Sequence, residues 1–265
     1  MKYAKPPLVV VLAEVRHLKV PPLSDDQVTA VKTKLADVLP LHRQIERGSV
    51  SFAVNPHNPG ATPIATTNKV RVDAFGSRDG LTLFTAGPES YSLETATYDG
   101  WDSFRSLLER VTEARIEAGR PDGVNRLGLR YVDEIRLPAS KQETPNWSKY
   151  LDPQVIAPMP GGMSLQVEQQ QAIVQYSTDR DDDTLTLRYG AVNGPPSITA
   201  DVRPKPPAPG HYFLLDTDAA WTPTGTPEFD GPTILKAADR IHTDVTALFE
   251  STLTDKVRRE VFGGH

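Results

Sequence analysis

The chain contains no cysteine among its 265 residues. This absence excludes disulfide bonds, zinc ribbons, iron–sulfur clusters and thiol nucleophiles. Long hydrophobic runs are lacking too, because the mostly apolar stretch at residues 8–16 contains Glu14 and is too short to span a bilayer. The same stretch has no small-residue cleavage site of the kind that ends a signal peptide. We therefore expect a soluble cytoplasmic protein that makes no contact with a membrane.

An excess of basic charge is also missing. The formal net charge is −5 and the isoelectric point is about 5.7. Proteins that are attracted to nucleic acid need lysine and arginine in excess on one face. The overall charge therefore disfavours nucleic acid as a partner, although a local basic patch would still allow it to bind.

The known sequence signatures of catalysis are absent as well. The chain has no nucleophile elbow of the Gly-x-Ser-x-Gly form, no phosphate-binding Walker loop and no dinucleotide fingerprint. Its 6 histidines never fall at the His-x-x-x-His spacing that binds zinc on a helix. We therefore predict that the protein is not an enzyme and that it uses no cofactor.

Clear secondary-structure patterns are present. Residues 8–16 are apolar on both alternating faces, which is typical of a strand covered on both sides. Strict alternation predicts another strand at residues 127–137. Ser24 and Gln27 form a capping box that begins a helix. Apolar residues at helical spacing predict three helices, at residues 24–39, 101–118 and 233–261.

The predicted fold is α+β, with two antiparallel sheet-and-helix halves. The N-terminal half covers residues 1–140, and the C-terminal half covers residues 145–265 and ends in a long amphipathic helix. The halves meet near residues 138–150, where the sequence is polar. In the N-terminal half we expect a short strand at residues 50–54, followed by a surface loop at residues 55–68 that is rich in proline.

The C-terminal helix contains an irregularity. The polar segment at residues 251–255 interrupts its apolar stripe. The hydroxyl of Thr254 can accept a hydrogen bond from the backbone N–H of Lys256 or Val257, as an N-cap residue does. We therefore predict that the helix bends or restarts at this point.

The most informative charges share one face of the strand at residues 127–137 and are Arg126, Arg130 and Arg136. With Arg71, on a strand expected to lie beside this one, they would form a cationic strip for phosphate or for an acidic partner. The alternative is that carboxylates on neighbouring strands, such as Glu134 and Glu94, neutralise them.

Asp216 and Asp218 are two residues apart on the last predicted strand, so their side chains point the same way. Both carboxylates could bind one Mg²⁺, which would make the protein a metal-dependent phosphoryl-transfer enzyme. The competing interpretation is a solvated polar face at the end of a strand. The aspartate-rich run at residues 179–183 lacks the glycine of a calcium loop, and we interpret it as a hairpin turn.

Three segments carry a resemblance to a known family. They are Pro-Pro-Leu-Val to Glu-Val-Arg at residues 6–16, Tyr-Asp-Gly-Trp-Asp-Ser-Phe at residues 98–104 with Arg-Leu-Gly-Leu-Arg-Tyr-Val at residues 126–132, and Leu-Phe-Glu-Ser-Thr-Leu-Thr-Asp-Lys at residues 248–256. In this order they span the chain and resemble a sporadically distributed family of uncharacterised bacterial proteins of about this length. The chain departs from the family pattern at Asp133, where the family tends to have asparagine. The resemblance implies the fold and boundaries but no catalytic residues, and such scattered distribution is common among phage, mobile-element and defence genes.

The function that the sequence favours is protein binding without catalysis. A partner-binding surface needs a few large apolar anchors within a polar rim. Val257, Val261 and Phe262 lie among basic residues near the C-terminus and fit this description. The arginine-bearing strand face offers a second such surface. A nucleic-acid-binding protein that uses the same arginine face is an alternative function.

Overall fold

The computed structural model describes residues 3–53, 64–138, 145–157, 169–197, 201–202 and 206–263. Within these residues the strands are β1 (Leu8–His17), β2 (Leu41–Ala53), β3 (Ile64–Gly76), β4 (Thr82–Ala86), β5 (Ser90–Thr95), β6 (Val124–Ile135), β7 (Ala172–Ser177), β8 (Asp183–Gly194) and β9 (Gly210–Trp221). The helices are α1 (Asp25–Lys34), α2 (Trp101–Glu117), α3 (Gly231–Ser251) and α4 (Asp255–Glu260), with short 3₁₀ turns at η2 (Trp147–Lys149) and η3 (Pro153–Val155).

A single antiparallel sheet runs through both halves that the sequence predicts. Its nine described strands follow the order β2-β3-β4-β5-β1-β6-β9-β8-β7. Strand β6 pairs with β1 on one side and with β9 on the other, so that Leu129 lies opposite both Ala13 and Ala219. The α+β class with antiparallel pairing is therefore confirmed. The connection near residues 138–150 lies between strands of one sheet rather than between two sheets.

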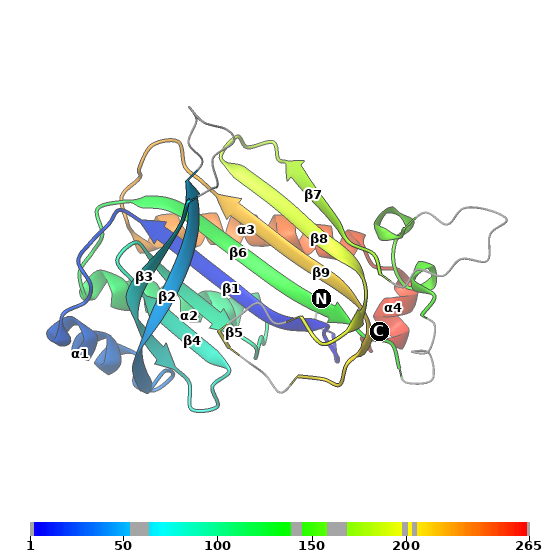
Figure 1. Ribbon diagram of the computed structural model, residues 1–265, viewed down its shortest axis with the longest axis horizontal. Helices are drawn as coiled ribbons and strands as arrows, with labels where there is room; N and C mark the ends of the chain where they lie inside the picture. The colour runs from blue at the N-terminus through cyan, green and yellow to red at the C-terminus, as the bar shows by residue number, and fades with distance from the viewer. Residues whose placement is uncertain are drawn as a thin grey trace.

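Alternation along β1 and β6 determines what each face of the sheet buries. Helices α2 and α3 lie against one face of the sheet (Figure 1). Odd-numbered residues such as Val11 belong to the main core, which also contains buried residues of these two helices. Even-numbered residues such as Val10 and Val132 face the opposite side and pack with Val202 from the segment before β9. Residues 8–16 form a strand in the middle of the sheet, as expected, but its even-numbered face is fully buried only at Val10, and Arg16 is exposed.

The first two helices begin where the sequence predicts. At the start of α1, Ser24 Oγ accepts a hydrogen bond from the Gln27 N–H at 3.3 Å, and the Gln27 side chain accepts one from the Ser24 N–H at 2.8 Å. Helix α1 ends at Lys34, earlier than predicted, and Leu35 is its C-cap residue, with φ −107° and ψ 8° and a fully buried side chain. Helix α2 matches its predicted span. In the described part of the chain, no helix has the length and apolar character needed to cross a membrane.

The C-terminal helix restarts, as predicted. Helix α3 ends at Ser251 and α4 begins at Asp255. Between them Thr254 Oγ1 accepts a hydrogen bond from the Val257 N–H at 3.4 Å and donates one to the Tyr150 carbonyl at 2.8 Å. The break therefore turns the chain and docks α4 against the η2 turn.

The β2–β3 hairpin corrects the expectation for residues 50–68. Strand β2 already begins at Leu41, and β3 begins at Ile64, inside the predicted loop. Residues 54–63 lie outside the described residues. The start of β2 escapes prediction because this strand lies at the edge of the sheet and is mostly polar on both faces, which removes the apolar alternation.

The apolar side chains of the C-terminal segment are core, which corrects the expectation of an exposed partner-binding surface there. Val257 and Phe262 are 0% and 1% exposed, and Val261 packs partly buried against the same cluster. The Phe262 ring meets the Tyr3 ring edge-on, with 5.1 Å between centroids. The Lys5 N–H also donates to the Phe262 carbonyl at 2.9 Å. Sequence periodicity cannot tell these buried anchors from exposed ones.

We expect Phe262→Ala to lower the free energy of unfolding by about 3–5 kcal/mol, because it removes a fully buried aromatic side chain. Urea denaturation followed by circular dichroism measures this change. Arg259→Ala, at an exposed position of α4, is the control and should change the free energy of unfolding by less than about 0.5 kcal/mol. Equal stability of Phe262→Ala and the wild type would contradict the assignment of this segment to the core.

Candidate functional site

The arginine-bearing face of the sheet is filled with internal ion pairs. Arg130 Nε and Nη2 each donate to a carboxylate oxygen of Asp216 at 2.7 Å. Arg126 lies between two carboxylates, 3.5 Å from Glu14 and 3.6 Å from Asp218. Carboxylates on neighbouring strands therefore neutralise these arginines, as the alternative interpretation of the sequence proposes.

The other two arginines do not extend this face into a cationic strip. Arg136 donates to the neighbouring Glu134 at 2.8 Å and lies over the Tyr212 ring, 4.5 Å from its centroid. Arg71 is on β3, which β4, β5 and β1 separate from β6. The prediction that Arg71 lies on a neighbouring strand is therefore wrong. Binding of a protein or a nucleic acid at this face stays a prediction.

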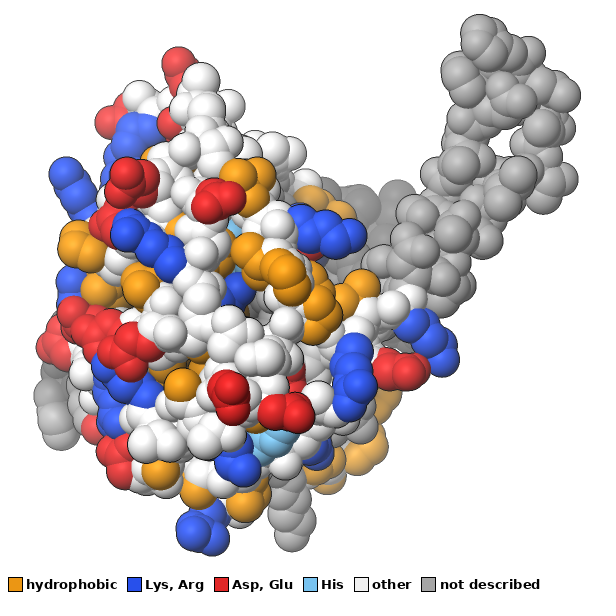
Figure 2. All heavy atoms as spheres, turned by 90° about the vertical axis from the view of Figure 1, so that its left-hand side faces the viewer, with side chains coloured by type: hydrophobic (Ala, Val, Ile, Leu, Met, Phe, Trp, Pro, Cys, Tyr) orange, Lys and Arg blue, Asp and Glu red, His pale blue; other side chains and the backbone are white. Residues whose placement is uncertain are grey.

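The end of the molecule that carries α1 shows the same mixing of charges. Acidic and basic side chains are interspersed over the face that Figure 2 shows. Lys34 of α1 lies 3.2 Å from Glu113 and 2.5 Å from Glu117 on α2, and Arg110 lies 2.6 Å from Asp37. Such pairing leaves little net field to attract a polyanion.

The carboxylates of the predicted magnesium site are also engaged. Asp216 and Asp218 share one sheet face, but Arg130 holds Asp216 in a bidentate pair and Arg188 lies 3.9 Å from it. Among the described residues, no group of three or more His, Asp or Glu side chains is arranged to hold a metal ion. The aspartate-rich run at residues 179–183 forms the turn between β7 and β8, as predicted.

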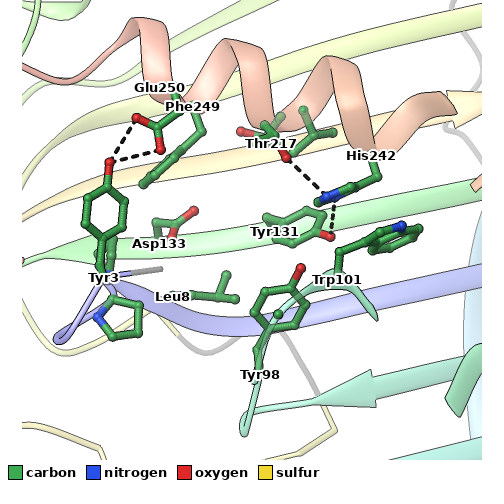
Figure 3. Close-up of a pocket in the computed structure, with 15 residues that line it drawn as sticks. Tyr3, Leu8, Tyr98, Trp101, Tyr131, Asp133, Thr217, His242, Phe249 and Glu250 are labelled. Atoms are coloured by element: carbon green, nitrogen blue, oxygen red, sulfur yellow. Dashed lines mark hydrogen bonds between the residues drawn. The ribbon is translucent and has the colours of Figure 1, made fainter. Parts of the chain in front are cut away.

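A cavity of about 400 Å³ lies on the opposite face of the sheet, beneath α3 (Figure 3). Its floor consists of Tyr131 and Asp133 from β6 and Thr217 from β9, all of them buried. Its roof is the C-terminal half of α3. Its side walls are residues 3–8 on one side and residues 98–101, which lead into α2, on the other.

The wall at residues 98–101 is held in place by stacking and hydrogen bonds. The Trp101 ring stacks on the His242 ring, with 4.1 Å between centroids and 8° between planes. The Trp101 indole N–H donates to Asp239 at 2.9 Å, and the Tyr131 hydroxyl forms a 3.0 Å hydrogen bond with His242 Nδ1. Burial lowers the pKa of His242 to about 4, so this imidazole is neutral at pH 7.

On the other side of the cavity, Glu250 already has hydrogen-bond and ion-pair partners within the protein. The Tyr3 hydroxyl hydrogen-bonds to the Glu250 carboxylate at 2.9 Å. Arg258 of α4 donates to the same carboxylate at 3.2 Å and to the Glu250 carbonyl at 2.7 Å. The negative charge of Glu250 therefore has a cationic partner within the protein.

Asp133 differs from the other buried acidic residues that the structure describes. Five others have a basic partner, and these pairs are Asp73 with His42, Glu94 with Arg47, Glu134 with Arg136, Asp183 with Arg240 and Asp216 with Arg130. Asp133 is 5% exposed, and its carboxyl forms no hydrogen bond or ion pair with another described residue. The side chain lies in the cavity (Figure 3). A buried carboxyl without a partner is costly, and its position here makes the cavity the candidate functional site.

Burial raises the pKa of Asp133 from 3.8 to about 8, and the negative charge of Asp216 on the neighbouring strand adds to the shift. At pH 6 the carboxyl is therefore protonated in the folded protein and ionised in the unfolded chain. Folding takes up a proton in this range, so the folded state loses stability as the pH rises from the unfolded pKa through the folded one.

One feature of the sequence points to this site, although it is not part of any known motif. Alternation places Leu127, Leu129, Tyr131 and Ile135 on one face of β6, and Asp133 is the charged residue in this otherwise uncharged row. A lone acid on an apolar strand face was therefore available as a signal. The walls of the cavity come from segments far apart in the chain, and tertiary packing alone brings them together.

A comparison with models of known protein families finds no match to this chain, and a comparison with curated protein sequences finds none either. The resemblance to a sporadically distributed bacterial family therefore stays a prediction.

We expect Asp133→Asn to stabilise the protein at high pH, because the amide removes a carboxyl that must stay protonated or ionise without a partner. The stability advantage should grow by about 1.4 kcal/mol per pH unit within the window between pH 4 and 8. Thermal melts of both proteins at pH 5, 6, 7 and 8 measure it. Asp181→Asn, at an exposed position, should show no such pH-dependent gain. A melting temperature of Asp133→Asn below that of the wild type at pH 8 would contradict this account.

Proposed function

We propose that this chain is a non-enzymatic binding protein that holds a small organic ligand in the cavity beneath α3. The observation that carries the proposal is the Asp133 carboxyl, which is buried, lies in the cavity and lacks a partner among the described residues. A ligand that supplies a hydrogen-bond donor would remove the cost of burying this group. The unfavourable free energy of burying Asp133 without a partner would be relieved when the ligand binds, and this would add to the binding affinity.

The size and lining of the cavity support a small organic molecule. A volume of about 400 Å³ falls within the range of roughly 300–1,000 Å³ that is usual for ligand pockets. The lining is mainly aromatic and aliphatic, with Tyr98, Trp101, Leu8, Val245 and Phe249 around the acidic floor. A flat or elongated apolar body with one polar end fits this arrangement.

The proposal is for binding without turnover. Catalysis needs a base beside a nucleophile or a scissile group, together with a group that stabilises the developing charge. Apart from Asp133, two polar groups of this cavity that could take part in catalysis are instead held by structural contacts. His242 is neutral and fixed between Trp101 and Tyr131, and Glu250 is fixed by Arg258.

Binding can be tested with three indole compounds of similar size, namely tryptamine, tryptophol and indole-3-propionate. Isothermal titration calorimetry should detect at least one of them. Thr246 lies exposed at the rim of the cavity, so Thr246→Trp should block the entrance and weaken binding by about tenfold or more.

Ala247→Trp is the matched control, because Ala247 is the next residue of α3, is exposed and does not line the cavity. It should leave the dissociation constant unchanged within about twofold. If none of the three compounds binds, or if both tryptophan variants weaken binding equally, the proposed function is wrong.

A further inference from the structure

We infer that the polar end of the ligand is a protonated amine, which forms an ion pair with Asp133 on the floor of the cavity. This inference rests on the proposed function and names the chemical class of its ligand. Three properties of the cavity carry it. These are its balance of charge, its aromatic walls and the isolation of the Asp133 carboxyl.

The balance of charge in the cavity favours a cation. The described residues that line it include two acids, Asp133 and Glu250, and neither lysine nor arginine is among them. Arg258 neutralises Glu250 from outside the cavity, which leaves Asp133 as the lining acid without a cationic partner in the part of the chain that the structure describes. An anionic ligand would be repelled by Asp133, and the described lining residues offer no lysine or arginine to attract it.

The aromatic walls add to this preference. Tyr98, Trp101 and Tyr131 line the cavity together with Tyr3 and Phe249. Aromatic rings present negative faces that attract an ammonium group within about 6 Å of a ring centroid, most strongly when the cation is shielded from water. Rings around a lone carboxylate are the combination that recognises amines with an apolar body.

Isolation of the carboxyl makes the binding of an amine sensitive to pH. In the free protein burial raises the pKa of Asp133 to about 8. Pairing with an ammonium group requires the carboxylate form, so each bound amine releases one proton from Asp133 to solvent below that pH.

The titratable and charged groups that face Asp133 around the cavity and across the strand are Tyr3, Tyr98, Tyr131, His242, Glu250 and Asp216. Of these, His242 and the tyrosines keep their neutral forms between pH 6 and 8, because burial lowers the pKa of His242 and raises those of Tyr3, Tyr98 and Tyr131.

The test compares tryptamine with tryptophol, which replaces the ammonium group by a hydroxyl on the same indole body, and with indole-3-propionate. Calorimetry at pH 7.5 should show tryptamine binding to the wild-type protein about tenfold or more tightly than tryptophol. Indole-3-propionate should bind most weakly. The affinity for tryptamine should rise by about tenfold between pH 6 and pH 7, as expected for the release of one proton.

Two variants separate the charge of Asp133 from its shape. Asp133→Asn keeps a hydrogen-bonding group of the same size and should lose most of the preference for tryptamine, keeping at most the roughly threefold part that the aromatic rings supply, and its binding should not depend on pH. Asp181→Asn, at an exposed position away from the cavity, should retain the wild-type preference. Because Asp133→Asn is expected to be the more stable protein, loss of its binding cannot be attributed to unfolding.

The outcomes distinguish this inference from the proposed function on which it rests. If tryptophol or indole-3-propionate binds as tightly as tryptamine and Thr246→Trp blocks it, the cavity is a binding site but the amine assignment is overturned. If the full preference for tryptamine survives in Asp133→Asn, the ion pair is overturned. If none of the compounds binds to the wild-type protein, both proposals fail.

Discussion

The pairing of β6 with β1 on one side and β9 on the other is the constraint on which the structure depends. It joins the two predicted halves in one sheet, and it fixes the direction of every β6 side chain. Even-numbered residues such as Arg126 and Arg130 face the open side, where carboxylates of β1 and β9 neutralise them. Odd-numbered residues face the helical layer, and there Asp133 is carried beneath α3 by the same alternation that buries its apolar neighbours.

The two faces of β6 differ in whether their charged side chains have partners. On the open face, Arg126 and Arg130 pair with carboxylates of the neighbouring strands and Arg136 pairs with Glu134, so these arginines are already engaged within the protein. Under α3, the polar groups of the walls are also satisfied, through Trp101 with Asp239 and Tyr3 with Glu250. Asp133 remains as the buried acid without a partner in the described structure. A group that lowers stability in the free protein, inside a cavity of ligand size, is most simply explained by what the cavity binds.

Local patterns in the sequence predict local structure well. The capping box at Ser24 and the restart at Thr254 are both confirmed, because each depends on side chains within a few residues of the backbone groups that they bind. Predictions that depend on spatial neighbours were less successful. Arg71 lies several strands from β6, and Phe262 is buried against Tyr3, because sheet order and helix docking decide these contacts. The cavity belongs to the same class, since its walls come from three distant segments.

The most direct test of the central claim is the pKa of Asp133 itself, measured by carbon-13 NMR of the side-chain carboxyl in the free protein and with saturating tryptamine. We predict that the pKa of Asp133 is near 8 in the free protein. We also predict that this pKa falls when the amine is bound, because the ammonium group stabilises the carboxylate. A free-protein value near that of an exposed aspartate, or a value that tryptamine leaves unchanged, would contradict the claim that this carboxyl is held without a partner for a cationic ligand.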